Sequence, residues 1–134
     1  MAKIMLDTNI CIYILNNKPF YIKDRLQKYS VGDIAISSIS VAELFFGVEK
    51  SKYKESNILA LNGFLANLKI IDFSTKEAIQ YAKLRTELER KKALIGAMDM
   101  LIAATALANN LILITNNTKE FKRVKNLEIQ NWVV

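Results

Sequence analysis

The chain has 134 residues, of which 51% are hydrophobic, and a net charge of +6 from 19 Lys and Arg against 13 Asp and Glu. This length and apolar content predict a single domain, residues 1–134, that can bury a core without disulfides. The positive charge suits a protein that binds a polyanion, and equally an ordinary basic surface. With one cysteine and no apolar stretch of roughly 18 residues, we expect a cytoplasmic protein without a membrane span.

The residue types that the chain lacks narrow its chemistry. It contains no histidine, which excludes a Ser-His-Asp or Cys-His catalytic set, a histidine general base and an imidazole metal site. Its four glycines are scattered, so neither a P-loop nor a dinucleotide-binding fingerprint is present. Any catalysis must therefore depend on carboxylates, lysine, tyrosine or the single thiol.

Apolar runs of strand length alternate with segments of helical spacing along the whole chain. We expect strands at residues 3–6, 33–37, 69–73, 111–114 and 127–134. We expect helices at residues 8–16, 19–29, around 41–46, 57–68, 75–91 and 97–109, with a helical turn at 119–123. This alternation predicts a three-layer α/β/α domain with a mainly parallel central sheet.

Three acids lie in apolar surroundings, where a carboxylate without a partner is costly. Asp7 ends the first apolar run, Glu43 lies in an apolar helix after the second strand, and Asp99 lies in the apolar helix at 97–109. The carboxyl ends of parallel strands form one ligand-binding edge, so these acids can converge there. Other acids, Glu77 among them, lie in caps or polar helix faces where solvent accounts for them.

Converging carboxylates repel one another unless a cation lies between them. A site of oxygen ligands without His or Cys suits the hard divalent ions Mg²⁺ and Mn²⁺, which in turn suit phosphate substrates. Two such ions, roughly 4 Å apart, can activate a water and stabilise the leaving oxygen of a phosphodiester. The three acids therefore predict metal-dependent hydrolysis of phosphodiester bonds.

A fourth acid position is expected after the strand at 111–114. Glu120 can reach the site from there, and Asn117 can lend a neutral oxygen or a hydrogen bond, although a turn capped by Asn beside a solvated Glu explains the pattern equally well. Four nearby polar side chains can position a water or a phosphate group, namely Thr8, Asn9, Thr115 and Asn116. Helix capping alone also explains the first two.

Each of the three acids also has an ordinary structural interpretation. Asp7 can cap a helix, Asp99 can be a first-turn acid favoured by the helix dipole, and Glu43 can pair with a nearby lysine. If all three structural interpretations were correct, the chain would be a noncatalytic basic module that binds nucleic acid or another protein. A receiver-type phosphoryl-transfer domain is a third alternative, but it usually needs a second acid where this chain has Asn9.

Four segments in order, residues 5–9, 38–44, 99–104 and 115–121, followed by residues 131–132, resemble the PIN-domain ribonucleases and in particular the VapC-type toxins. The match extends over essentially the whole chain. The resemblance implies a PIN-like fold and a Mg²⁺- or Mn²⁺-dependent endoribonuclease that cleaves RNA, with structured RNA such as tRNA as one substrate class.

The same resemblance implies roles for individual residues and for partners. It puts the three acids at the characteristic metal positions and implies a fourth acid in segment 115–121. Many relatives carry Asp where this chain has Asn117, so we assign the fourth position to Glu120 and keep Asn117 as the alternative. It further implies a homodimer and a VapB-type antitoxin, whose C-terminal segment lies in an apolar groove and through which the complex binds operator DNA.

Overall fold

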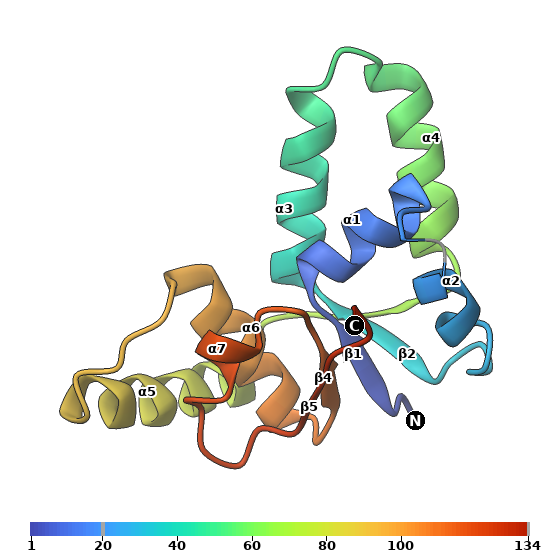
Figure 1. The fold of residues 1–134 in the computed structure, drawn as a ribbon. Helices are drawn as coiled ribbons and strands as arrows, with labels where there is room; N and C mark the ends of the chain where they lie inside the picture. The colour runs from blue at the N-terminus through green and yellow to red at the C-terminus, as the bar shows by residue number, and fades with distance from the viewer. Residues whose placement is uncertain (20, 134) are drawn as a thin grey trace.

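A computed structural model describes residues 1–19 and 21–133, and its centre is one sheet of five parallel strands (Figure 1). The strands are β1 (Ile4–Leu6), β2 (Ile34–Ser37), β3 (Lys69–Ile71), β4 (Ile112–Ile114) and β5 (Ile129–Gln130). Their order across the sheet is β3-β2-β1-β4-β5, and every neighbouring pair is parallel. Ile4 of the central strand is in register with Ile34 on one side and Ile112 on the other. The expected parallel α/β architecture is confirmed.

Helices cover both faces of this sheet (Figure 1). One layer consists of α1 (Thr8–Asn16), α2 (Tyr21–Leu26), α3 (Ser38–Glu49) and α4 (Lys54–Leu65). The other layer consists of α5 (Thr75–Arg90), α6 (Ala97–Ala108) and α7 (Thr118–Phe121). The predicted three layers are therefore present. No helix within residues 1–19 and 21–133 is long and apolar enough to cross a membrane.

Side chains of the central strand alternate between the two helical layers. Ile4 and Leu6 pack against the first layer, whereas Met5 packs against the second. All three residues of β1 are buried, as is typical of a parallel strand covered on both faces. The carboxyl end of β1 therefore opens between the two layers, where side chains from both can meet.

Several element boundaries differ from those expected. The helix expected at 57–68 is α4, which begins at Lys54 because the polar residues of its first turn face solvent and Glu55 suits the positive end of the helix dipole. The second helix and the last strand are shorter than the expected 19–29 and 127–134. Residues 20 and 134 of those two expected elements lie outside the described residues.

Candidate functional site

Asp7 lies at the carboxyl end of the central strand and begins α1. Its backbone N–H donates to the Ile114 carbonyl of β4 over 2.9 Å, so the sheet itself fixes its position. Its side chain caps α1, because Oδ1 accepts the Thr8 backbone N–H at 2.8 Å. Asp7 is only 4% exposed, and this burial raises the pKa of its carboxyl above the ordinary value. The capping role and the site role are thus combined in one residue.

Thr115 holds the second oxygen of Asp7 from the end of the neighbouring strand. The Thr115 hydroxyl donates to Asp7 Oδ2 over 2.7 Å, and it also accepts the Asn117 backbone N–H at 3.0 Å. This hydrogen bond opposes the effect of burial on the pKa of Asp7. Both carboxylate oxygens of Asp7 therefore have a fixed direction.

Glu43 reaches the same end of the sheet from α3. Its Oε1 accepts a hydrogen bond from the Thr8 hydroxyl at 2.6 Å, and the same hydroxyl lies 2.8 Å from the Ser40 hydroxyl. Glu43 is close enough to Asp7 for its charge to raise the pKa of Asp7. Thr8 thus joins the first helix of the chain to the acid on α3.

Asp99 and Glu120 form the other side of the cluster, from the first turn of α6 and from α7. The two carboxyl groups share a hydrogen bond, which raises the pKa of Asp99 and lowers that of Glu120. The Asn117 side-chain amide lies between them, 3.4 Å from Asp99 Oδ2 and 3.2 Å from Glu120 Oε2. Asn117 therefore serves both carboxylates as a neutral hydrogen-bond donor.

The four predicted acids influence one another electrostatically. Burial is the largest cause that raises the pKa of Asp99 to about 7, followed by its hydrogen bond with Glu120. The negative charges of Asp7, Glu120 and Glu43 raise it further. The structure therefore places the acids that the sequence singled out near one another, although they come from the end of β1 and from α3, α6 and α7.

Thr8 and Thr115 donate hydrogen bonds to the acids, but the other two predicted positioning residues, Asn9 and Asn116, are placed differently. Asn9 is exposed in the first turn of α1. Asn116 donates from Nδ2 to the Tyr13 phenol oxygen over 2.9 Å, while its buried Oδ1 has no hydrogen-bond partner among the described residues. Asn116 therefore contributes a free oxygen near the carboxyl end of β4 rather than a bond to one of the four acids.

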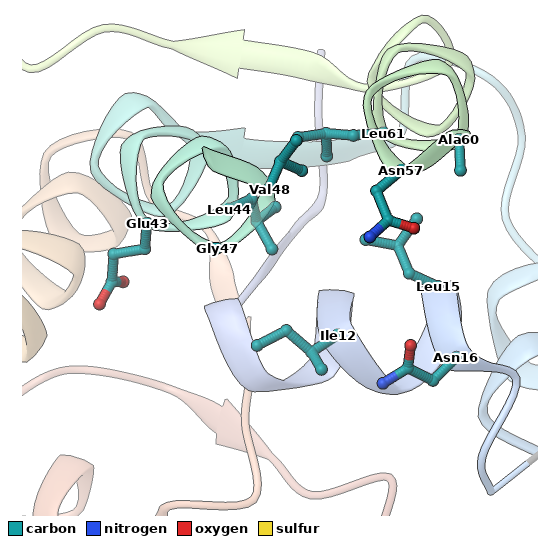
Figure 2. A pocket seen from close by; sticks show the side chains of 10 residues that line it. All are labelled: Ile12, Leu15, Asn16, Glu43, Leu44, Gly47, Val48, Asn57, Ala60 and Leu61. Atoms are coloured by element: carbon teal, nitrogen blue, oxygen red, sulfur yellow. The ribbon is translucent and has the colours of Figure 1, made fainter. Parts of the chain in front are cut away.

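An apolar groove lies beside the acid cluster, between α1, α3 and α4 (Figure 2). It has a volume of about 310 Å³. Its apolar lining includes Ile12, Leu15, Leu44, Val48 and Leu61. Glu43 is at its border, and in Figure 2 the carboxylate of Glu43 points away from the apolar side chains. Glu43 therefore belongs to both the groove and the acid cluster.

Comparison with known proteins identifies the family. The model of the PIN domain family matches residues 4–127. Ribonuclease VapC2 of Rickettsia felis is 53% identical over 129 residues, which are 96% of each chain. This chain belongs to the VapC family of PIN-domain ribonucleases. The tRNA(fMet)-specific endonuclease VapC of Salmonella typhimurium is 39% identical over 132 residues, 98% of this chain and 99% of that one.

The fold agrees with solved VapC structures as well. The crystal structure of DNA-bound VapBC from Salmonella typhimurium contains a chain that superposes with a TM-score of 0.93 at 39% identity, covering 98% of this chain and 99% of that chain. The PIN domain expected from the sequence motifs is therefore confirmed in both sequence and fold.

PIN-domain ribonucleases generally use divalent metal ions, and the donor set of this VapC-family chain suits one. The side chains at the cluster offer oxygen atoms as metal ligands, and the Asn117 amide also carries a nitrogen. Hard divalent ions prefer oxygen ligands. Across residues 1–19 and 21–133, no three acidic or thiol side chains already converge as closely as metal ligands do. The cluster is instead held by the Asn117 amide and by the proton that Asp99 and Glu120 share. A divalent cation would replace both and would offset the negative charges that, in addition to burial, raise the pKa of Asp99.

Sequence reasoning did not find every residue near this VapC-family site. Ser37 and Ser40 are fully buried polar side chains between β2 and Glu43. The sequence predicts Ser38 or Ser40 as the cap of the helix that carries Glu43, but the structure shows that Ser37 is the cap. The signal that could have found Ser40 is its spacing, because a residue three positions before Glu43 on a helix lies on the same face.

Proposed function

We propose that this chain is the toxin of a VapBC-type toxin–antitoxin pair and that it hydrolyses RNA phosphodiester bonds as a divalent-metal-dependent endoribonuclease. The observation that carries this proposal is the convergence of four carboxylates from distant segments, where burial, and in addition the repulsion between the acids, raises the pKa of Asp99 to about 7. Structural caps and surface acids do not need to meet in this way. Such repulsion is typical of a site built to hold a cation.

In this proposal the metal ion is Mg²⁺ or Mn²⁺, and its ligands are Asp7, Glu43, Asp99 and Glu120, with Asn117 as a further candidate. When bound, the ion would activate a water and stabilise the charge that develops on the phosphate. The oxygen-only ligand set supports these two ions over zinc, which is usually bound by Cys or His.

In this proposal the remaining polar residues orient the four acidic metal ligands and the RNA. Thr115 and Thr8 direct the carboxylates of Asp7 and Glu43 through their hydroxyl groups. Asn117 keeps Asp99 and Glu120 together while the site holds no cation. Asn9 is exposed beside the cluster and is available to an RNA phosphate, whereas the amide oxygen of Asn116 is buried and can accept a hydrogen bond from an internal water.

We propose a structured RNA such as tRNA as the substrate class. The Salmonella relative named a tRNA(fMet)-specific endonuclease supports this class, since it matches this chain over 98% of its length. The net charge of +6 supports association with any RNA backbone and does not by itself select one sequence.

The proposed protein partner is a VapB-type antitoxin, and the apolar groove between α1, α3 and α4 is its proposed docking site. The groove suits an apolar peptide segment, and Glu43 at its border puts the acid cluster within reach of a basic side chain on that segment. Operator DNA would bind through the antitoxin complex, as supported by the DNA-bound VapBC relative. We also propose that the chain forms a homodimer. We propose the cytoplasm as its location, because a free buried thiol such as Cys11 is typical of a reducing compartment.

The decisive experiment is RNA cleavage by the purified chain under controlled metal conditions. Cleavage of a tRNA should stop in excess EDTA and return with added Mg²⁺ or Mn²⁺. The Asp7→Asn variant should remain folded, because Asn also caps helices well, and should lose cleavage by at least about 100-fold. Asp24→Asn, which changes an exposed acid on α2, is the matched control and should cleave like the wild-type chain.

Cleavage that persists in EDTA, or that survives Asp7→Asn, would falsify the proposed metal-dependent activity. A chain that binds RNA without cutting it under any metal condition would instead support the alternative of a noncatalytic binding module.

A further inference from the structure

A row of three hydroxyl groups connects the end of β2 to Glu43. Ser37 Oγ is 3.3 Å from Ser40 Oγ, Ser40 Oγ is 2.8 Å from Thr8 Oγ1, and Thr8 Oγ1 is 2.6 Å from Glu43 Oε1. Ser37 and Ser40 are fully buried, so water does not compete for the contact between them, whereas the two contacts of Thr8 are partly buried. The row links β2, α1 and α3 at the carboxyl edge of the sheet.

Hydrogen-bond stoichiometry gives this row one direction. A hydroxyl group has a single proton, and a carboxylate can only accept. Thr8 must therefore donate to Glu43 and must accept from Ser40. Ser40 then donates to Thr8, so the proton in its contact with Ser37 comes from Ser37. The Ser37 oxygen is in turn held by the Ser40 backbone N–H at 3.0 Å.

We propose that Ser40 is a positioning residue of the ribonuclease site, which acts through Thr8 to fix the orientation of the Glu43 carboxylate for the metal ion. This inference rests on the proposed function, because it concerns the ligand geometry of the same site. A hydroxyl that already accepts a hydrogen bond is polarised and donates more strongly, so Ser40 strengthens the bond from Thr8 to Glu43. With Oε1 held in this way, Oε2 would be the oxygen that Glu43 offers to the cation.

The location of Ser40 also distinguishes it from the helix cap. The capping contact is made by Ser37, whose side chain accepts the Ser40 backbone N–H. That bond needs the backbone of residue 40 and not its side chain. The Ser40 hydroxyl is thus free to serve Thr8, and Glu43, three residues later, lies on the same face of α3.

The first test compares Mn²⁺ binding by the wild-type chain and by Ser40→Ala, using isothermal titration calorimetry. Direct hydrogen-bond partners of metal ligands typically contribute about 10- to 100-fold to affinity, and Ser40 is one step further away, so we expect a loss of about three- to tenfold. Ser38→Ala is the matched control, because its hydroxyl accepts the Phe73 backbone N–H at 3.1 Å and does not belong to the row. This control should bind Mn²⁺ like the wild-type chain.

The second test separates an effect through Glu43 from a general loss of packing. On a Glu43→Gln background, Ser40→Ala should cause little further loss of Mn²⁺ affinity, because the carboxylate that it orients is gone. Ser40→Thr keeps the hydroxyl and should bind Mn²⁺ more tightly than Ser40→Ala. In tRNA cleavage, Ser40→Ala should raise the Mn²⁺ concentration at half-maximal rate and leave the KM for RNA nearly unchanged.

Equal Mn²⁺ affinity in Ser40→Ala and wild type, an equal loss in Ser38→Ala, or an undiminished loss on the Glu43→Gln background would each overturn the proposal. Wild type, Ser40→Ala, Glu43→Gln and the variant that combines both changes, unfolded by heat without metal, show whether Ser40 and Glu43 are coupled at all. A wild-type chain that binds no Mn²⁺ while this coupling persists would contradict the proposed metal site but leave the hydroxyl row intact. Absence of the coupling would contradict the row itself.

Discussion

Thr115 and Asp7 are 108 positions apart in the chain, yet the Thr115 hydroxyl donates to Asp7 Oδ2 over 2.7 Å in the buried centre of the acid cluster. Burial raises the pKa of Asp7, and this hydrogen bond opposes the increase by favouring the ionised form. Metal binding needs that ionised form. Thr115→Val should therefore raise the pKa of Asp7 further and weaken Mn²⁺ binding by about tenfold or more, as measured by calorimetry.

Thr115→Ser retains the hydroxyl and serves as the control for this prediction. It should restore most of the Mn²⁺ affinity that valine removes. If the valine and serine variants bound Mn²⁺ equally, the hydroxyl of Thr115 would have no part in preparing Asp7.

Asp99 should make the metal-free chain less stable as the pH rises. Its pKa in the folded chain, about 7, lies above the ordinary 3.8, so the folded state binds more protons than the unfolded state between these values. The free energy of unfolding should therefore fall as the pH increases from about 3.8 to about 7. In EDTA at pH 8, Asp99→Asn should melt at a higher temperature than wild type, and this advantage should shrink toward pH 4. An advantage that is independent of pH would contradict the raised pKa of Asp99.

Three residues of the acid cluster were predictable because each is an acid in an apolar stretch of sequence. An acid at the end of an apolar strand or inside an apolar helix must have a partner, and a parallel sheet brings such ends to one edge. That argument identified Asp7, Glu43 and Asp99 without any coordinates. In the structure these acids influence one another: in addition to burial, the charge of Glu43 raises the pKa of Asp7, and the charges of both raise that of Asp99.

Other features were not predictable, since they depend on contacts between distant segments. The spacing of Ser40 to Glu43 is visible in the sequence, but the contact between Ser40 and Thr8 is not, because Thr8 is 32 positions away. Glu77 was interpreted as a solvent-exposed capping acid, and this was wrong. Its side chain is fully buried, because Asn109 at the end of α6 covers and hydrogen-bonds its carboxylate. The capping box of Ser74 and Glu77 itself is confirmed.

The fourth ligand position can be resolved by exchanging charges at Glu120 and Asn117. Glu120→Gln should weaken Mn²⁺ binding by about tenfold or more if its carboxylate is a ligand. Asn117→Asp should have the opposite effect on Mn²⁺ affinity, because it adds a carboxylate between Asp99 and Glu120. The same change removes the amide that bridges them, so the metal-free chain should melt at a lower temperature.

Asn117→Ala completes this comparison, because it removes the bridging amide without adding a charge. It should lower the metal-free melting temperature less than Asn117→Asp does and should not tighten Mn²⁺ binding. Wild-type affinity in Glu120→Gln would exclude Glu120 as the fourth ligand and leave Asn117 as the candidate.

Glu77 should stabilise the fold, independently of the metal site, through the buried contacts at the start of α5. Burial alone would raise its pKa, but hydrogen bonds from Ser74 and Asn109 outweigh that effect and lower the pKa from 4.5 to about 2. Glu77→Gln should reduce the free energy of unfolding near pH 7 by about 2 kcal/mol, the size typical of hydrogen bonds to a charged group. Part of the loss arises because the new amide faces the Asn109 amide.

The pH dependence of this loss tests its cause. Since the folded-state pKa of Glu77 lies below the unfolded value, the stability that its charge contributes is complete above about pH 4.5 and disappears as the pH falls toward 2. Urea unfolding from pH 7 to pH 2.5 should therefore show the curves of wild type and Glu77→Gln converging in acid. Glu87→Gln, which alters a partly exposed ion pair with Lys91 at the end of the same helix, should change stability little at any pH. Parallel curves for wild type and Glu77→Gln would mean that packing, and not the ionised carboxylate, accounts for the loss.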